Sequence, residues 1–308
     1  MFNQFAAVGS SSLIQLRQLN IANLKSLRRR FMQLSGVTKG RPQAEVVLPE
    51  VIRQLRGLSK VAADGHSLTL GAWNMEFLNR WKAAYFLDSY REISLRHHLL
   101  AVEEVDEPGL ALIAKACNYS YFVSTPNSRG QAVAFLVHER LRILKCVEYA
   151  ELIGVLGIPD LRPALRIDLL DEATGAQFSA IVVHLKSMRG GVQATSIIRY
   201  QQLSNLVQSI GDTSEFALVL GDFNCFLDDT HDTSPLIAHG YKLINRWNQA
   251  PTHHFGGRLD GLFYANLPPH FKLGNYNVRN FWRNSLIGTG FSDHGLLTWN
   301  LTLSASRD

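Results

Sequence analysis

The sequence predicts a mixed α/β (α+β) sandwich, and three observations lead to that fold class. Short apolar runs typical of buried strands alternate with longer segments of helical periodicity from about residue 68 onward. Several of these runs end in, or lie beside, polar side chains, as in Phe216–Leu220 followed by Gly221-Asp222-Phe223-Asn224. No repeat or low-complexity linker appears after residue 65. Strands and helices mixed in this way imply helices packed on sheets, in two or four layers.

Each expected element rests on its apolar spacing and on the residues that bound it. Residues 67–73 read as a strand that ends at Asn74, and Asp171 to Gly175 form the turn of a hairpin. In chain order we expect a strand at 67–73, a helix at 81–96, a strand at 98–102, a helix at 110–117, a strand at 132–137, a hairpin of 165–170 and 178–183, a helix at 197–210, and strands at 216–220, 261–264 and 295–299.

The first 65 residues differ from the rest, which we take as a catalytic domain at 66–308. Seven of the 31 basic residues precede the first acidic one, Glu45, which leaves 24 basic against 26 acidic residues in the remainder. Residues 13–34 have apolar side chains three or four apart and contain Arg28-Arg29-Arg30, so they predict a basic amphipathic helix. This helix either docks on the body, acts as a mitochondrial presequence within residues 1–44, or contacts nucleic acid, a protein or an anionic membrane.

The bulk composition excludes several classes of protein. No apolar run approaches the roughly 18 residues needed to span a bilayer, and the three cysteines lack the spacing of a zinc site. The opening residues lack a charged segment before a continuous apolar stretch, so a classical secretory signal is not expected. We therefore expect a cytoplasmic protein or one exported without such a signal, with a mitochondrial location as the alternative.

Oxygen-bearing side chains follow the apolar runs and predict a site for a hard cation. Asn74, Glu104, Asp222, Asn224 and Asp293 have no accompanying set of histidine and cysteine ligands. Such oxygen donors suit Mg²⁺, with Mn²⁺ or Ca²⁺ as alternatives. A single acid after a strand is usually a turn former or a helix cap, but the whole set is hard to explain in that way.

Two histidines supply groups for proton transfer, since an imidazole can exchange a proton near neutral pH. His184 follows an apolar run, and His294 lies beside Asp293, with Asp260 as the carboxylate that would orient it. His253 and His254 read as loop residues. Arg129 and Arg162 are candidates for holding a phosphate.

With these residues in place, the chain resembles the endonuclease/exonuclease/phosphatase superfamily, which has the deoxyribonuclease I-like fold. The resemblance covers about residues 67–303. Its motifs, in the order of the family, are Trp73-Asn74, Ala-Val-Glu-Glu-Val at 101–105, Arg129-Gly130, Arg162-Pro163, Val-His-Leu-Lys-Ser at 183–187, Gly-Asp-Phe-Asn at 221–224, Arg-Leu-Asp at 258–260 and Ser-Asp-His at 292–294.

The resemblance implies a four-layered α/β sandwich with a metal-dependent phosphodiesterase or phosphatase site. Glu104 and Asp293, with Asn74 beside them, resemble the Mg²⁺ ligands. Asp222 and Asn224 resemble the pair that aligns the attacking water and the phosphate. His294 and Asp260 resemble the base and its orienting carboxylate, and His184 resembles the second histidine of the site.

The sequence departs from the family at three places. Glu103 replaces the usual Gln before the metal-binding Glu, so that Glu103 and Glu104 can exchange roles. The deoxyribonuclease branch has a Glu that orients the first histidine, and this chain has no Glu near Gln131 in that place. His184 stands where the abasic-site repair branch has Tyr.

We expect a nuclease acting on DNA, and on RNA as a further substrate. The motif at 183–187, followed by Arg199-Tyr-Gln-Gln202, is similar to bacterial members usually described as nucleases. Lys186 offers a cation for phosphates. The loop expected at 277–284 adds Arg279 and Arg283 around the aromatic residues Phe281 and Trp282, which could bind phosphates and a base. The alternative is a phospholipid or phosphoinositide phosphatase or phosphodiesterase, sphingomyelinase-like, whose aromatic loop would enter a membrane.

Overall fold

Two six-stranded sheets pack face to face in the computed structural model, which describes residues 44–61, 65–212, 214–244, 250–281 and 291–303. The first sheet has the order β11 (Phe271–Arg279), β12 (Leu296–Leu303), β1 (Ser67–Leu78), β2 (Leu99–Val105), β4 (Ala132–Val137) and β3 (Ser120–Val123). The second has the order β5 (Leu141–Tyr149), β6 (Ala164–Asp171), β7 (Gln177–His184), β8 (Ala217–Asp222), β10 (Asp260–Ala265) and β9 (Lys242–Leu243).

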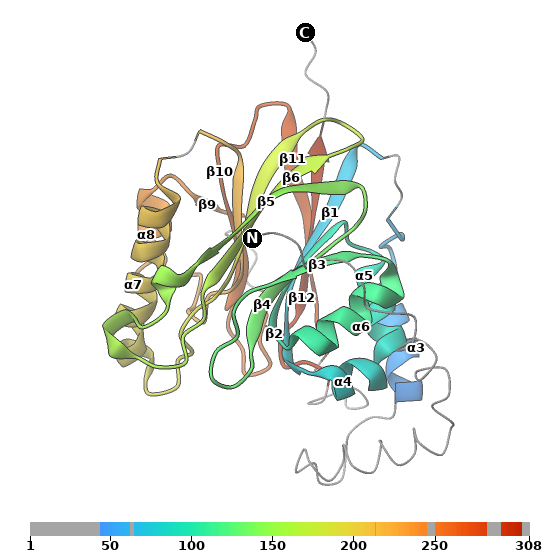
Figure 1. Cartoon of the computed structure of the whole chain (residues 1–308), viewed down its shortest axis with the longest axis horizontal. Helices are drawn as coiled ribbons and strands as arrows, with labels where there is room; N and C mark the ends of the chain where they lie inside the picture. The colour runs from blue at the N-terminus through green and yellow to red at the C-terminus, as the bar shows by residue number, and fades with distance from the viewer. Residues whose placement is uncertain (1–43, 62–64, 213, 245–249, 282–290, 304–308) are drawn as a thin grey trace, which may run out of the picture. The chain divides into compact units, whose positions relative to one another are not determined.

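Helices cover the outer face of each sheet, on opposite sides of the pair (Figure 1). The first sheet carries α3 (Ala44–Gln54), α4 (Arg80–Tyr85), α5 (Leu87–Ser94) and α6 (Glu107–Cys117). The second carries α7 (Val192–Ile210), α8 (Ser234–Ala238) and the short 3₁₀ turns η1 (Ala150–Leu152) and η2 (Val155–Gly157). The expected four-layered α/β sandwich is confirmed.

Strand β1 shows how its sequence serves both faces of a buried sheet. Leu70 and Ala72 lie in the apolar cluster between the two sheets, whereas Trp73 and Met75 lie in the cluster under the helices. Successive side chains of a strand point to opposite faces, so a strand covered on both sides must be apolar almost throughout. This double burial fixes β1, and hence Asn74 within it, between the layers.

Most of the expected elements are present, with shifted ends. The hairpin of β6 and β7 is antiparallel as expected. The helix expected at 81–96 is instead two helices, because Phe86 leaves the helical conformation at φ −109° and ψ 24°. Residues 277–279, which the sequence analysis assigns to a loop, form the end of β11.

The N-terminal arm falls largely outside the described residues, as does the helix expected at 13–34. Within the part that is described, α3 packs under the first sheet, with Val51 and Leu55 buried in the same cluster as Tyr90 of α5. Residues from α3 onward therefore pack with the domain, although the sequence analysis places residues up to 65 in the arm. None of the described helices has the length and apolarity that crossing a membrane requires.

Candidate active site

The candidate active site lies where strands from both sheets end together. In the second sheet, Asp222 of β8 pairs in register with His184 of β7 on one side and with Asp260 of β10 on the other. In the first sheet, Asn74 of β1 pairs with Glu103 of β2. The two sets meet because the Asn74 carboxamide donates a hydrogen bond to the Asp222 carboxylate across the sandwich.

Asp222 is the centre of this arrangement. Its Oδ1 accepts a hydrogen bond from the Asn224 backbone at 2.8 Å. Its Oδ2 accepts from Asn224 Nδ2 at 3.0 Å and from Asn74 Nδ2 at 3.1 Å. The Nε2 atoms of His184 and His294 lie 3.4 and 3.8 Å from the same Oδ2. Two imidazoles therefore flank one carboxylate oxygen.

Asp260 holds His294 in a fixed orientation. The Nδ1 atom of His294 lies 3.0 Å from both oxygens of Asp260, so Nδ1 donates and Nε2 faces Asp222. The Asp260 amide is itself anchored, because it donates to Thr252 Oγ1 at 3.0 Å. The Trp73 indole donates to the His294 carbonyl at 3.2 Å. The structure thus brings together the pair that the resemblance implies.

A bulge in β2 separates the roles of the two consecutive glutamates. Glu104 has a φ of +57° where the pairing with β1 and β4 is interrupted, and its side chain is partly exposed. Its Oε2 accepts hydrogen bonds from Gln131 at 2.9 Å and from the Phe77 amide at 3.2 Å, and its Oε1 lies 3.9 Å from His184. Glu103 is fully buried, and neither of its carboxyl oxygens has a hydrogen-bond partner among the described residues.

His253 joins the site although the sequence analysis assigns it to a loop. Residues 253 and 294 form a β-bridge, and their rings lie 4.6 Å apart at 78°. The Nε2 atom of His253 is 3.7 Å from Asp293 Oδ2, and Asp293 Oδ1 is 3.9 Å from His294. No periodicity or motif marks a histidine pair in a loop. Only the pairing of that loop with residues 293–295 reveals this neighbour.

Burial and neighbouring charges shift the pKa values of the side chains at the site. Burial raises the pKa of Glu103 well above its usual range and that of Asp222 to about 7, in the latter case against the opposing charge of His294. Burial also holds the pKa of His184 well below its ordinary value, with Arg162 and His294 adding to the effect. Burial opposes the charge of His294 too, but Asp260 and Asp222 outweigh it and raise the pKa of His294. The centre thus combines a neutral with a charged imidazole.

The donor set fits a divalent cation. Two groups, Asp222 with Asp260 and His294, and His253 with Asp293 and His294, place one ligand atom of each residue within 4.8 Å of the others. The crowding of acidic groups raises the free energy of their charged forms, which a cation would lower. The two buried carboxyl oxygens of Glu103 have no hydrogen-bond partner among the described residues, which is a second indication that a cation binds here. The carboxylate oxygens of these groups are the donors that suit a hard divalent cation, whereas the charged imidazole of His294 has no lone pair to offer one.

Of the predicted phosphate-binding arginines, the structure brings Arg162 to the site and leaves Arg129 at the surface. Arg162 donates from Nη2 to Gln131 Oε1 at 2.6 Å and lies 4.0 Å from Glu104. Gln131 therefore bridges Arg162 and Glu104. The Arg129 side chain is exposed, and its Nε lies 3.7 Å from Asp160.

Two other predicted basic residues have partners elsewhere. The Lys186 ammonium donates to the carbonyls of Ser187 at 3.1 Å and Arg189 at 3.3 Å, within its own loop. Arg279 donates to the carbonyl of Gln54 at the end of α3. The aromatic ring of Phe281 is fully buried, so this residue does not form the exposed aromatic loop that the sequence analysis expects. Trp282 and Arg283 lie outside the described residues.

Comparisons with known proteins agree with this fold. TDP2 of D. rerio, in a structure complexed with single strand DNA product, aligns with a TM-score of 0.61 and 16% identity, over 76% of this chain and 98% of that one. An endonuclease/exonuclease/phosphatase from Bacteroides vulgatus has a TM-score of 0.60 and 14% identity, over 77% and 99%. The human Nocturnin catalytic domain, with bound sulfate, has a TM-score of 0.58 and 17% identity, over 80% and 97%. A search of curated protein sequences finds no match.

The sequence itself matches the Endonuclease/Exonuclease/phosphatase family over residues 71–294, a span that begins in β1 and ends at the histidine held by Asp260. Because this match covers most of the chain and every side chain placed around Asp222, the chain belongs to the Endonuclease/Exonuclease/phosphatase family.

Proposed function

We propose that this protein is a magnesium-dependent phosphodiester hydrolase that cleaves nucleic acid, with DNA as the favoured substrate. The observation that carries the proposal is the convergence on Asp222, where two imidazoles and two carboxamides surround one carboxylate. Such a group of side chains can align a water molecule with a phosphate and accept its proton.

The reaction forms a phosphorus–oxygen bond to water as the bond to the leaving oxygen breaks. Asp222, whose pKa burial raises to about 7, accepts the proton that the water loses, and Asp260 fixes the charged imidazole of His294 so that its Nε2–H faces the reacting atoms. The neutral His184 donates a hydrogen bond to a phosphate oxygen, while Asn224 Nδ2 donates to Asp222 and to the Leu185 carbonyl and so holds Asp222 in place. Glu104, Asp293 and Asn74 would hold Mg²⁺, which when bound supplies positive charge against the phosphate oxygens.

Two observations support nucleic acid as the substrate. The structural neighbour TDP2 of D. rerio is complexed with single strand DNA product. Phe77 and Phe226 follow active-site residues of β1 and β8 and expose their rings, and exposed rings can stack on bases. The lipid alternative draws on Phe255, which is 87% exposed beside the loop of His253, because such a ring can also enter a membrane interface.

A substrate panel tests the proposal. Purified protein is assayed in Mg²⁺, with EDTA controls, on single-stranded DNA, plasmid DNA, RNA, sphingomyelin and phosphoinositides. We expect nucleic acid cleavage that EDTA abolishes, with binding that weakens steeply as salt rises. Turnover confined to sphingomyelin or phosphoinositides would establish the lipid alternative instead.

A further inference from the structure

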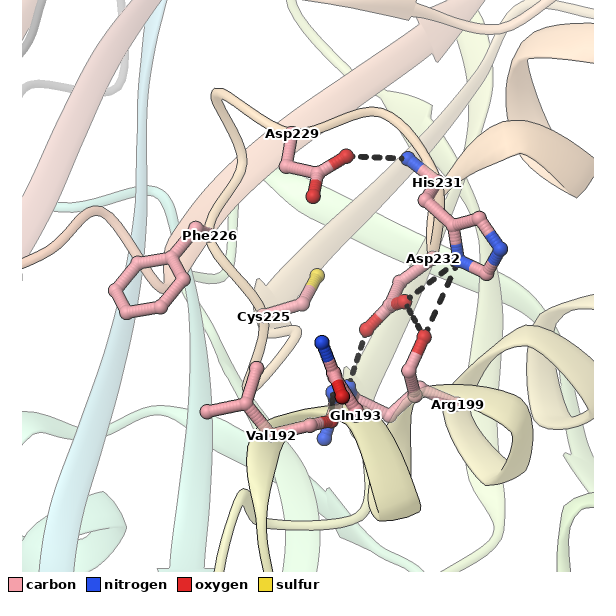
Figure 2. A pocket seen from close by; sticks show the side chains of 9 residues that line it. Val192, Gln193, Arg199, Cys225, Phe226, Asp229, His231 and Asp232 are labelled. Atoms are coloured by element: carbon pink, nitrogen blue, oxygen red, sulfur yellow. Dashed lines mark hydrogen bonds and ion pairs between the residues drawn. The ribbon is translucent and has the colours of Figure 1, made fainter.

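A cavity of about 320 Å³ adjoins the catalytic centre, in the size range of small-molecule sites (Figure 2). It lies between the start of α7 and the loop that follows β8. Asn224, which binds Asp222, is followed directly by Cys225 and Phe226 in the wall of the cavity. The wall of the cavity therefore begins one residue after Asn224 in the chain.

One side of the cavity is apolar. Val192 and Phe226 line it and are 48% and 43% exposed, so their apolar surface faces solvent rather than the core. The Phe226 ring packs against Gly257, where a Cβ atom would lie 2.6 Å from it. Figure 2 shows Phe226 and Val192 on one side and His231 and Asp232 on the other. An exposed ring held in this way offers a surface for stacking.

The opposite side of the cavity is polar, but the buried guanidinium of Arg199 on that side already has hydrogen-bond partners in the protein. Arg199 is fully buried and donates to Asp232 at 2.6 Å, to Thr195 Oγ1 at 2.8 Å, and to the carbonyls of Val192 at 3.1 Å and Lys186 at 3.2 Å. These bonds use the directions in which a guanidinium donates. Arg199 therefore builds the wall of the cavity and is not available to bind a phosphate.

The charge of the lining also disfavours an anion. Asp232 accepts hydrogen bonds from Ser196 and Arg199, which lower its pKa although burial opposes them. Asp229 adds a second carboxylate at the rim, where its Oδ1 accepts from the His231 amide. Two carboxylates against one guanidinium leave the lining negative. The occupant is consequently uncharged or weakly polar, unlike the headgroup of a phosphoinositide.

We infer that this cavity is a subsite for a nucleobase next to the scissile phosphate. The base stacks on Phe226 and contacts Val192, and the exposed carboxamide of Gln193 at the mouth has the donor and acceptor that a base edge requires. This inference rests on the proposed function and deepens it, because it makes the substrate a strand whose base is free to leave the stack. Single-stranded nucleic acid meets that condition without any cost of unpairing.

The test compares a single-stranded oligonucleotide with the same oligonucleotide carrying abasic residues on both sides of the cleaved bond. The wild-type protein is expected to have a roughly ten-fold higher kcat/KM for the strand with bases, as stacking on an aromatic ring predicts. Phe226→Ala should lose this preference, and Phe226→Tyr should keep it because the ring is retained. Ile237→Ala, on α8, is the matched control, since Ile237 is also 43% exposed and does not line the cavity.

A binding measurement separates failure of the subsite from failure of the proposed function. An oligonucleotide with a single 2-aminopurine is titrated with protein in the absence of metal, and stacking on Phe226 should quench its fluorescence in wild type and Phe226→Tyr but not in Phe226→Ala. Equal kcat/KM values for the two oligonucleotides in wild type, or equal quenching by all variants, would overturn the subsite. Absence of hydrolysis of both oligonucleotides and of bis(p-nitrophenyl) phosphate, with quenching intact, would instead refute the catalytic proposal alone.

Discussion

At the scale of single residues, His253 shows how a neighbour can tune a carboxylate that sequence motifs do identify. Burial opposes the charge of Asp293, but His253, whose Nε2 lies 3.7 Å from Asp293 Oδ2, and the charge of His294 outweigh it and lower the pKa of Asp293. The Asp293 side chain therefore stays charged, as a ligand of a cation must be. Partners of this kind typically change metal affinity by 10- to 100-fold.

We therefore predict that His253→Ala weakens the binding of Mn²⁺ at least about ten-fold, measured by isothermal titration calorimetry. His254→Ala serves as the control, because the neighbouring His254 is exposed and contributes only its backbone amide to the Asp293 carbonyl. Equal affinities of the two variants for Mn²⁺ would show that His253 has no part in the centre.

The residue scale also shows which of the predicted side chains the structure brings together and which it does not. Asp222, Asn224 and Asp260 can be found because motifs place them at the ends of recognisable strands. Arg279 instead donates to the Gln54 carbonyl of α3, 225 residues away in the chain, and no motif marks such a contact. A basic residue next to aromatic residues has the same sequence pattern whether its side chain binds a phosphate or donates to a carbonyl at the end of a helix.

At the scale of elements, the end of β8 is built around Gly221. Its φ is +129°, and a Cβ atom there would lie 2.3 Å from the Val183 carbonyl and 2.7 Å from Glu103 Oε1. Only glycine allows β8 to approach β7 and the buried glutamate this closely. This approach is what places Asp222 opposite His184.

Gly221→Ala should therefore destabilise the fold by more than about 3 kcal/mol, combining backbone strain with overpacking. Urea denaturation monitored by circular dichroism measures the change in the free energy of unfolding. Gly154→Ala, at a φ of +72° and a ψ of 8° with nothing within 4 Å of the added Cβ, should cost only about 1 kcal/mol. Similar losses in both variants would contradict the account of the close approach.

His97 connects two other elements and makes their packing sensitive to acid. Its Nδ1 donates to the Ile93 carbonyl of α5 at 2.8 Å, and its Nε2 accepts from Thr298 of β12 at 3.1 Å. Burial lowers the pKa of His97 to about 4, even though the bond to Ile93 favours the charged form. The folded state therefore holds the neutral imidazole, whereas the unfolded chain binds a proton below the ordinary pKa of about 6.5.

The contribution of His97 to stability is full above pH 6.5 and declines as the pH falls toward 4, by up to about 3 kcal/mol. We expect His97→Gln to have a shallower loss of unfolding free energy between pH 7 and pH 4.5 than wild type, in urea titrations at each pH. Parallel pH profiles of the two proteins would show that His97 is already free to ionise in the fold.

The strands that the sequence analysis does not predict share a physical cause. Strand β5 exposes most of its charged side chains at the edge of the second sheet, so it lacks the continuous apolar run of a central strand. Strand β11, at the edge of the first sheet, has the same character. The central strands β1, β4 and β8 are buried on both faces and are therefore visible from composition alone.

At the scale of the whole molecule, truncation of the N-terminus can test where the domain begins. Deletion of residues 1–43 should leave hydrolysis and thermal stability near those of the full chain. Deletion of residues 1–58 should lower the melting temperature by several degrees, since it removes the buried Val51 and Leu55, each worth about 2 kcal/mol. Equal melting temperatures for the two truncations, in differential scanning fluorimetry, would show that α3 does not support the domain.

The central claim is that one carboxylate, shared by two imidazoles and held by strands of both sheets, directs hydrolysis of a phosphodiester. The most direct measurement is kcat for a single-stranded DNA oligonucleotide in Mg²⁺, for wild type and for Asp222→Ala, with circular dichroism to verify that both proteins are folded. We expect Asp222→Ala to lose about 10²- to 10⁴-fold in kcat, and wild type to lose its activity in EDTA. A folded Asp222→Ala protein with kcat close to that of wild type would contradict the account.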